Sequence, residues 1–196
     1  MFTGLIRTMG TITRCEHRGD LVLEITADDA AFPLSLGASI ACHGICLTVT
    51  HFADATFTVA LSAETLACTN AAQWQLGTRI NLEPSLSVGD ALGGHFVSGH
   101  VDGLASITGR EPSGDSTIWE FAAPPELMGF IARKGSVAIN GTSLTVNSVA
   151  NNRFTVNIIE HTAKHTTFGD AHVGDTVNLE VDLLARYAAR LMETRA

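Results

Sequence analysis

The sequence has few basic residues and no cluster of them. Lysine and arginine together number 12 against 20 acidic residues, which gives a formal net charge of −8, and Lys134 and Lys164 are the only lysines. Nucleic acids and anionic membranes bind proteins through concentrated positive charge. We therefore expect no nucleic-acid and no membrane partner, and a neutral small molecule or another protein is the expected ligand.

Long apolar runs are also missing. The first residues lack a positively charged segment followed by an apolar run, and nowhere do about 18 apolar residues follow one another. With 45% hydrophobic residues in 196, the chain can still bury two modest cores. We expect a compact cytoplasmic protein.

Cysteines are few and unevenly placed. Cys15, Cys42, Cys46 and Cys68 all fall in the first half of the chain, so no disulfide framework repeats and reduced thiols are expected. Glycine-rich phosphate-binding loops of the dinucleotide or Walker type are absent as well. These absences argue against a disulfide scaffold and against a phosphate clamp.

What the sequence does contain is an internal duplication. The run GICLTV at 44–49 returns as GTSLTV at 141–146, 97 positions later, and FTV at 57–59 and NLE at 81–83 recur at the same offset. A repeat of this length far exceeds the roughly 20–50 residues of solenoid repeats and matches a small domain. The sequence predicts two tandem copies of one domain.

The boundaries follow from the openings of the two copies. Thr3-Gly4 matches Ser98-Gly99 at an offset of 95, so the copies differ by a two-residue insertion. We predict a first domain at 1–90, a second at 91–183 and a terminal helix at 184–196.

Each copy reads as six short strands. The runs are β-branched or alternating, they are separated by Gly, Asp, Asn and Pro, and no helical period lies between them. This pattern is typical of an antiparallel barrel or sandwich. The strands predicted in the first copy are 1–13, 21–26, 38–42, 45–52, 56–61 and 78–83, with a helical turn at 64–67 and its partner at 161–164.

After Asp182 the spacing of the apolar residues changes from that of a strand to that of a helix. This helical spacing indicates an amphipathic helix. Such a stripe either covers the chain's own barrel or docks on a partner subunit. The stripe consists of Leu183, Leu184, Tyr187, Ala188, Leu191 and Met192.

Six motifs in this order and in this duplicated frame resemble the riboflavin synthase family: MFTGLI, CLTV, AETL, GGHFVSGHVD, SLTV and NLEVD. The resemblance covers nearly the whole chain. It implies an all-β fold of two tandem six-stranded antiparallel Greek-key barrels, with a C-terminal α-helix that holds a homotrimer.

The resemblance also implies the reaction. One 6,7-dimethyl-8-ribityllumazine donates a four-carbon unit to another, giving riboflavin and 5-amino-6-ribitylaminouracil, with no metal and no added cofactor. This is the last step of riboflavin biosynthesis, and lumazine synthase is a candidate partner. Two copies of a barrel suit a reaction that holds two identical substrates together.

The residue chemistry agrees with such a ligand. Ribityl hydroxyls and pteridine edges are bound by Ser, Thr, Asn and backbone N–H groups rather than by cations. The residues that the resemblance implies for substrate binding are Gly4, Leu5, Ile6, Ser39, Cys46, Leu47, Thr48, Ala60, Leu61, Ser62, Ala63, Glu64, Thr65, Gly99, His100, Val101, Lys134, Ser143, Leu144, Thr145, Ile159, Glu160, His161, Thr162, Ala163 and Lys164.

Positions where the copies differ are the catalytic candidates, because one substrate must be donor and the other acceptor. By resemblance, Ser143 and Asp182 belong to the catalytic pocket, with Cys46, His100 and Ser39 around it, where the first barrel of one subunit meets the second barrel of its neighbour. The differing pairs are Cys46 and Ser143, Ser85 and Asp182, His43 and Asn140, Glu64 and His161, and Leu5 and His100.

Each candidate has a structural alternative. Cys46 is also a typical small core residue, Ser143 can hydrogen-bond backbone within a strand, and Asp182 can cap the terminal helix. His95 and His100 are five residues apart, which in a strand puts them on opposite faces and disfavours a metal pair. His100 suits proton transfer near neutral pH.

The sequence departs from the family pattern at His43, where Asn is usual, and at Asn140, where Asp is frequent. The second change leaves Asp182 as the main acidic candidate. A non-catalytic lumazine or flavin carrier of the antenna type is the alternative function, and a purely structural trimer is a third. The polar residues of the second copy favour the enzyme.

Overall fold

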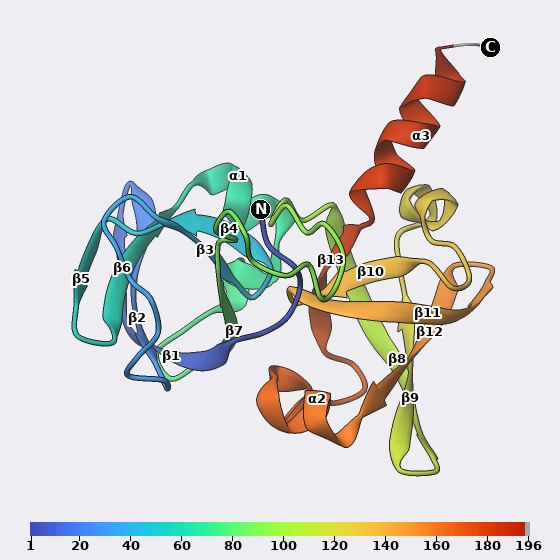
Figure 1. The fold of residues 1–196 in the computed structure, drawn as a ribbon, viewed down its shortest axis with the longest axis horizontal. Coiled ribbons are helices and arrows are strands. Elements are labelled where there is room, and N and C mark those ends of the chain that lie inside the picture. The colour runs from blue at the N-terminus through green and yellow to red at the C-terminus, as the bar shows by residue number, and fades with distance from the viewer. Residues whose placement is uncertain (195–196) are drawn as a thin grey trace.

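The structure is a computed structural model that describes residues 1–194. Two β units lie side by side, and a C-terminal helix extends away from them (Figure 1). The first unit is a seven-stranded antiparallel sheet in the order β4-β3-β7-β1-β2-β6-β5. Its elements are β1 (Thr8–Arg18), β2 (Asp20–Ala27), β3 (Ser39–Cys42), β4 (Ile45–Thr48), β5 (His51–Ala53), β6 (Thr56–Leu61), α1 (Ala63–Cys68), the 3₁₀ turn η1 (Asn70–Gln73) and β7 (Arg79–Pro84).

The second unit is a closed barrel in the order β10-β11-β12-β9-β8-β13. The two orders become the same cyclic Greek-key order when β4 and β5 are counted as one broken strand. Its elements are β8 (Gly103–Ser113), β9 (Ser116–Ala122), η2 (Pro125–Phe130), β10 (Ser136–Ile139), β11 (Thr142–Ala150), β12 (Arg153–Ile159), α2 (Glu160–His165), η3 (Thr167–Gly169) and β13 (Thr176–Val181), followed by α3 (Leu183–Glu193).

Between β4 and β5 the chain changes the strand with which it is hydrogen-bonded, from β3 to β6. The N–H of Val49 donates to Ala38 on the β3 side, and the next N–H, of Thr50, donates to Thr58 on β6. In the second unit β11 makes the same change as one continuous strand, with a bulge after Val146. The prediction of two six-stranded antiparallel barrels with a C-terminal helix is confirmed.

One strand prediction was wrong at its start. Residues 1–7 are not part of a ladder except for an isolated bridge between Phe2 and Val97, and β1 begins only at Thr8 and continues to Arg18. Thr3-Gly4 forms side-chain and cross-barrel contacts instead, so its backbone is satisfied without a neighbouring strand. The helical turns predicted at 64–67 and 161–164 are confirmed as α1 and α2.

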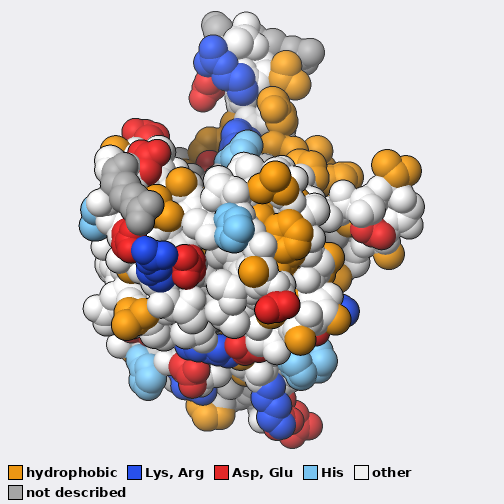
Figure 2. All heavy atoms as spheres, turned by 90° about the vertical axis from the view of Figure 1, so that its left-hand side faces the viewer, with side chains coloured by type: hydrophobic (Ala, Val, Ile, Leu, Met, Phe, Trp, Pro, Cys, Tyr) orange, Lys and Arg blue, Asp and Glu red, His pale blue; other side chains and the backbone are white. Residues whose placement is uncertain are grey.

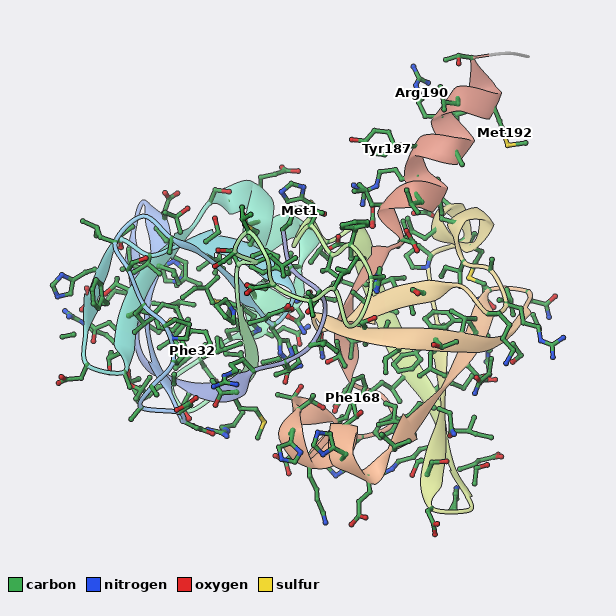
Figure 3. The ribbon with its side chains drawn as sticks, viewed as in Figure 1. Met1, Phe32, Phe168, Tyr187, Arg190 and Met192 are labelled. Atoms are coloured by element: carbon green, nitrogen blue, oxygen red, sulfur yellow. The ribbon has the colours of Figure 1, made fainter. Side chains whose placement is uncertain are left out.

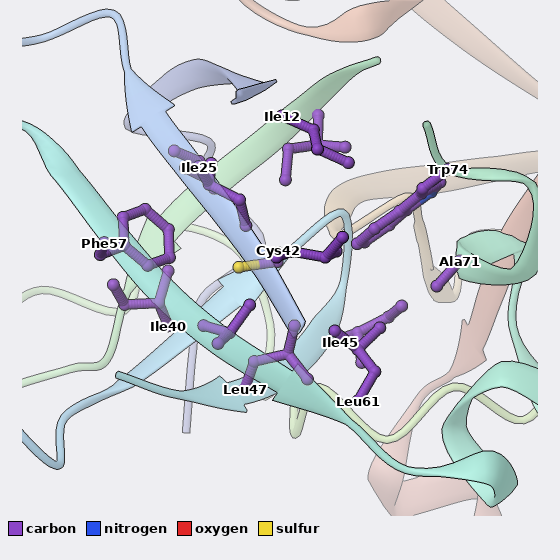
Figure 4. Close-up of a cluster of buried hydrophobic side chains, with 14 of the residues drawn as sticks. Ile12, Ile25, Ile40, Cys42, Ile45, Leu47, Phe57, Leu61, Ala71 and Trp74 are labelled. Atoms are coloured by element: carbon purple, nitrogen blue, oxygen red, sulfur yellow. The ribbon is translucent and has the colours of Figure 1, made fainter. Parts of the chain in front are cut away.

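Each unit has its own core, made by the alternating inward residues of its strands. β2, for example, alternates buried and partly exposed positions along its length. Figure 4 shows the first core, where Cys42 lies among isoleucines and Phe57. Burial raises the pKa of the Cys42 thiol, which keeps it protonated. The core cysteine is therefore Cys42, while Cys46 is only partly buried.

The two units meet across a pseudo-twofold contact. Gly44 and Gly141 both have positive φ angles, and a Cβ on Gly44 would lie 2.6 Å from the backbone nitrogen of Gly141. Asn81 Nδ2 donates to the carbonyl of Asn140 in the second unit. The GxxLTV and NLE motifs that reveal the duplication thus form the joint between its two halves.

Helix α3 leaves its apolar stripe uncovered. Leu184, Tyr187 and Leu191 are 67%, 62% and 60% exposed. Figure 3 shows the helix clear of both barrels, and Figure 2 shows apolar side chains on it that no other part of the chain covers. The alternative in which the stripe covers the chain's own barrel is wrong. The last two residues of the predicted helix lie outside the described residues. Within the described part of the chain, the helices are all too short or too polar to span a membrane.

Candidate functional site

In each copy a buried glutamate carboxylate binds the first residues of that copy, which are called its opening below: Thr3 and Gly4 in the first copy, Ser98 and Gly99 in the second. Glu83 on β7 accepts hydrogen bonds from the N–H of Thr3 at 2.7 Å, the N–H of Gly4 at 2.9 Å and the Thr3 hydroxyl at 2.6 Å. Burial raises the pKa of Glu83, and these hydrogen bonds oppose that shift because they favour the charged form. The carboxylate fixes the path of the first residues over the molecule.

The second copy repeats this arrangement. Glu180 on β13 accepts from the N–H of Ser98 at 2.6 Å and the N–H of Gly99 at 2.9 Å. Burial raises its pKa as well. The glutamate of the NLE motif is therefore a structural clamp in both copies.

Each clamped opening lies over the other barrel. The N–H of Ser143 donates to the carbonyl of Gly4 at 2.8 Å, and the N–H of Cys46 donates to the carbonyl of Gly99 at 2.9 Å. A Cβ on Gly4 would lie 2.7 Å from the nitrogen of Ser143, so only glycine permits the approach. The first residues of each copy thus contact the other barrel at equivalent positions.

The pocket over the second barrel brings many predicted residues together. It is a cavity of about 260 Å³ between the opening of the chain, β11 and α2. A larger cleft of about 550 Å³ around His43, Arg79 and Asp170 contains none of the predicted site residues. The lining of the smaller cavity is Gly4, Leu5, Ile6, Thr142, Ser143, His161, Thr162, His165 and Thr166.

The four catalytic candidates divide between two places within one chain. Ser143 is on β11, and Asp182 immediately precedes α3. Cys46 is on β4, and its N–H donates to the carbonyl of Gly99, the residue before His100 in the chain. Cys46 and Gly99 therefore meet over the first barrel as Ser143 and Gly4 meet over the second.

His95 was not among the predicted catalytic residues. Its Nδ1 lies 2.7 Å from the Ser143 hydroxyl, and its buried Nε2 makes no hydrogen bond within residues 1–194. Burial lowers the pKa of His95, and the charge of Asp182 opposes that shift. A neutral imidazole beside a hydroxyl can accept its proton. No signal in the sequence indicates this contact, because the two residues are 48 positions apart in the chain.

Asp182 caps α3. Its Oδ1 accepts from the N–H of Leu184 at 2.9 Å, which stabilises the first turn of the helix. Its charge also acts on His95. Whether it takes part in turnover remains a prediction.

Among the predicted substrate-binding residues, Leu47, Leu61 and Leu144 point into the two cores and are less than a tenth exposed. Any contact they make with a ligand must come from their backbone. On α1 and α2 the charged residues are exposed, Thr65 and Thr162 are half-buried, and Glu160 pairs with Lys164 at 2.6 Å. Within the described residues, no three His, Cys, Asp or Glu side chains group as a metal site.

The two departures from the family pattern lie in the joint between the barrels. His43 and Asn140 both have positive φ angles. His43 Nδ1 accepts from the N–H of Asn81 at 3.2 Å, and Asn140 Oδ1 accepts from the N–H of Asn178 at 2.8 Å. The two residues perform equivalent structural tasks.

A family model for the lumazine binding domain matches the chain twice, at residues 3–85 and 98–182. The fold is similar to a solved structure of LumP complexed with riboflavin, with a TM-score of 0.82, 21% identity, and coverage of 92% of this chain and 99% of that chain. The fold and paired pockets define a protein with a duplicated lumazine-binding domain.

Curated relatives narrow this class. The chain is 48% identical to the riboflavin synthase of Brucella abortus over 98% of both chains. It is 37% identical to that of Bacillus subtilis over 98% of this chain and 90% of the relative, and 38% identical to that of Saccharomyces cerevisiae over 95% and 84%. The chain belongs to the riboflavin synthase family and is an enzyme of the transferase class.

Proposed function

We propose that the enzyme catalyses the dismutation of two 6,7-dimethyl-8-ribityllumazine molecules into riboflavin and 5-amino-6-ribitylaminouracil. The observation that carries this proposal is the contact of His95 with Ser143, which lines the pocket over the second of two related barrels. Residues 1–90 and 91–183 are proposed as the two lumazine-binding barrels and 184–196 as the oligomerisation helix.

The proposed chemistry begins at Ser143. His95 accepts the hydroxyl proton at Nδ1 while the Ser143 oxygen bonds to the pteridine ring of one lumazine, which becomes the four-carbon donor. The second lumazine gives a proton of its acidic 7-methyl group to solvent water, and the resulting carbanion attacks the donor ring. The adduct then fragments: the bond to the Ser143 oxygen breaks, His95 returns the serine proton, and the amine of the departing pyrimidine takes up the proton lost from the 7-methyl group.

Alignment of the two rings supplies much of the acceleration, because the substrates carry the reactive methyl groups themselves. Ser, Thr and backbone groups around the cavity hold neutral hydroxyls without a cation. The first residues of the two copies make equivalent contacts, so each would orient one of the two rings in an equivalent way.

The proposed active unit is a homotrimer. The exposed stripe on α3 needs a partner surface, and a pocket completed between subunits would enclose the two substrates together. The cytoplasm is the proposed compartment, and lumazine synthase is a candidate partner that supplies the substrate.

The test is conversion of purified lumazine to riboflavin, followed by flavin fluorescence and product chromatography in the presence of a chelator. The proposal expects one riboflavin and one pyrimidine for every two lumazines consumed. Binding of lumazine without conversion would instead support an antenna-type carrier, for which similarity to LumP complexed with the same lumazine, at 20% identity, is evidence of fold alone.

A further inference from the structure

The segment 98–102, called the strap below, opens the second copy and connects both barrels. The N–H of Gly99 donates to Glu180 of the second barrel, and its carbonyl accepts from the N–H of Cys46 in the first. Val101 packs against the core of the first unit. The position of the strap therefore sets the backbone that faces Cys46.

The last residue of the strap is bound to the base of α3. Asp102 Oδ2 accepts from the N–H of Val181 at 2.8 Å, and both carboxylate oxygens accept from Arg186 Nη2, at 2.7 and 2.8 Å. The side chains of Arg186 and Asp102 are only 33% and 17% exposed. A partly buried, charge-assisted pair of this kind holds its groups in a defined geometry.

This link has no counterpart in the first copy. At the offsets that relate the copies, Asp102 corresponds to Arg7 and Val181 to Pro84, which has no N–H to donate. The side chain of Arg7 points to a long surface pair with Asp29, at 3.8 Å. The barrel itself therefore does not require the acid, which occurs only in the copy that continues into a helix.

We propose that Asp102 and Arg186 are positioning residues for a substrate pocket over the first barrel, where Gly99 meets Cys46. Arg186 ties the base of α3 to the strap, so a partner surface that fixes α3 also fixes the Gly99 carbonyl that contacts Cys46. This inference rests on the proposed function, in which that pocket holds one of two substrates. Under this proposal, assembly through α3 aligns the pocket in addition to holding the subunits together.

The first variant is Arg186→Gln, and its matched control is Arg190→Gln, which removes an exposed pair with Glu193 on the same helix. Amide hydrogen exchange of Cys46 is compared with that of Ser143, its equivalent under the pseudo-twofold. We expect Arg186→Gln to speed exchange at Cys46 and not at Ser143, and to lower turnover on the order of 10- to 100-fold through misalignment. Arg186→Lys should recover part of both, and Arg190→Gln should match the parent.

Three results would overturn the proposal: parent-like exchange at Cys46, equal acceleration at Cys46 and Ser143, or a loss of turnover that follows only the loss of assembly in sedimentation. Should Arg186→Gln be unstable, Asp102→Asn receives the same comparison, because the amide keeps an acceptor for Val181 and loses the charge for Arg186. If the parent forms no riboflavin, the proposed function fails, and the exchange comparison still decides whether the strap is coupled to α3.

Discussion

The hydroxyl of Ser143 lies 2.7 Å from Nδ1 of His95, whereas its equivalent in the first copy is the thiol of Cys46. Two pockets with the same frame therefore carry different chemistry. The frame consists of the glutamate clamps and glycine contacts that both copies share. The difference provides the asymmetry that a reaction between two identical molecules needs.

His43 should make the protein acid-sensitive. Burial lowers its pKa to about 3, while an unfolded histidine has a pKa of about 6.5. The unfolded chain binds the proton more readily than the folded chain does. The contribution of His43 to the free energy of unfolding is therefore fully present above about pH 6.5, and it falls by up to about 1.4 kcal/mol per pH unit as the pH drops from there towards about 3. His43→Asn, which installs the residue of the second copy, should flatten this dependence.

The measurement is urea unfolding at pH 7 and at pH 4.5. The exposed His51→Asn is the control and should retain the acid sensitivity of the parent. Equal losses of stability on acidification in parent and His43→Asn would contradict the assignment.

Removal of residues 184–196 should break the proposed trimer, because the exposed stripe on α3 is the surface that lacks a cover. Sedimentation should then report smaller particles, and turnover should fall sharply if the active pocket is shared between subunits. The melting temperature controls for damage to the barrels. A truncated protein that sediments like the parent would refute the role given to the helix.

Asp182→Asn should impair turnover more than binding. The amide oxygen can still cap α3 at Leu184, but the negative charge that acts on His95 is lost. A positioned acid or base contributes on the order of 100- to 10,000-fold in rate, and less where substrate acidity shares the work. Steady-state turnover is to be compared with riboflavin affinity from fluorescence quenching. Unchanged turnover would leave Asp182 as a cap only.

The sequence predicted the architecture because duplication and strand periodicity are local signals. GICLTV with GTSLTV and the two NLE motifs located the repeated frame, and the spacing of Leu184, Tyr187 and Leu191 indicated the helix. The predicted start of β1 was wrong because residues 1–7, which bend at Gly4, make contacts other than a strand ladder, and a short apolar run does not show this in sequence.

The site was predicted less completely, because its assembly depends on long-range contacts. Nothing local indicates that Gly4 crosses to Ser143, or that Gly99 crosses to Cys46. His95 was set aside because its spacing from His100 excluded a metal pair, yet its partner is 48 residues away in the chain. Contacts of this range follow from the fold and not from a motif.

The most direct test of the account compares Ser143→Ala with Cys46→Ala, two substitutions at equivalent positions of the duplicated frame. Pre-steady-state and steady-state formation of riboflavin are measured alongside riboflavin affinity and melting temperature. The account predicts that Ser143→Ala loses on the order of 100-fold or more in turnover, that Cys46→Ala loses much less, and that both still bind ligand. Equal losses in the two variants, or a larger loss for Cys46→Ala, would contradict the assignment of the chemistry to the pocket of Ser143 and His95.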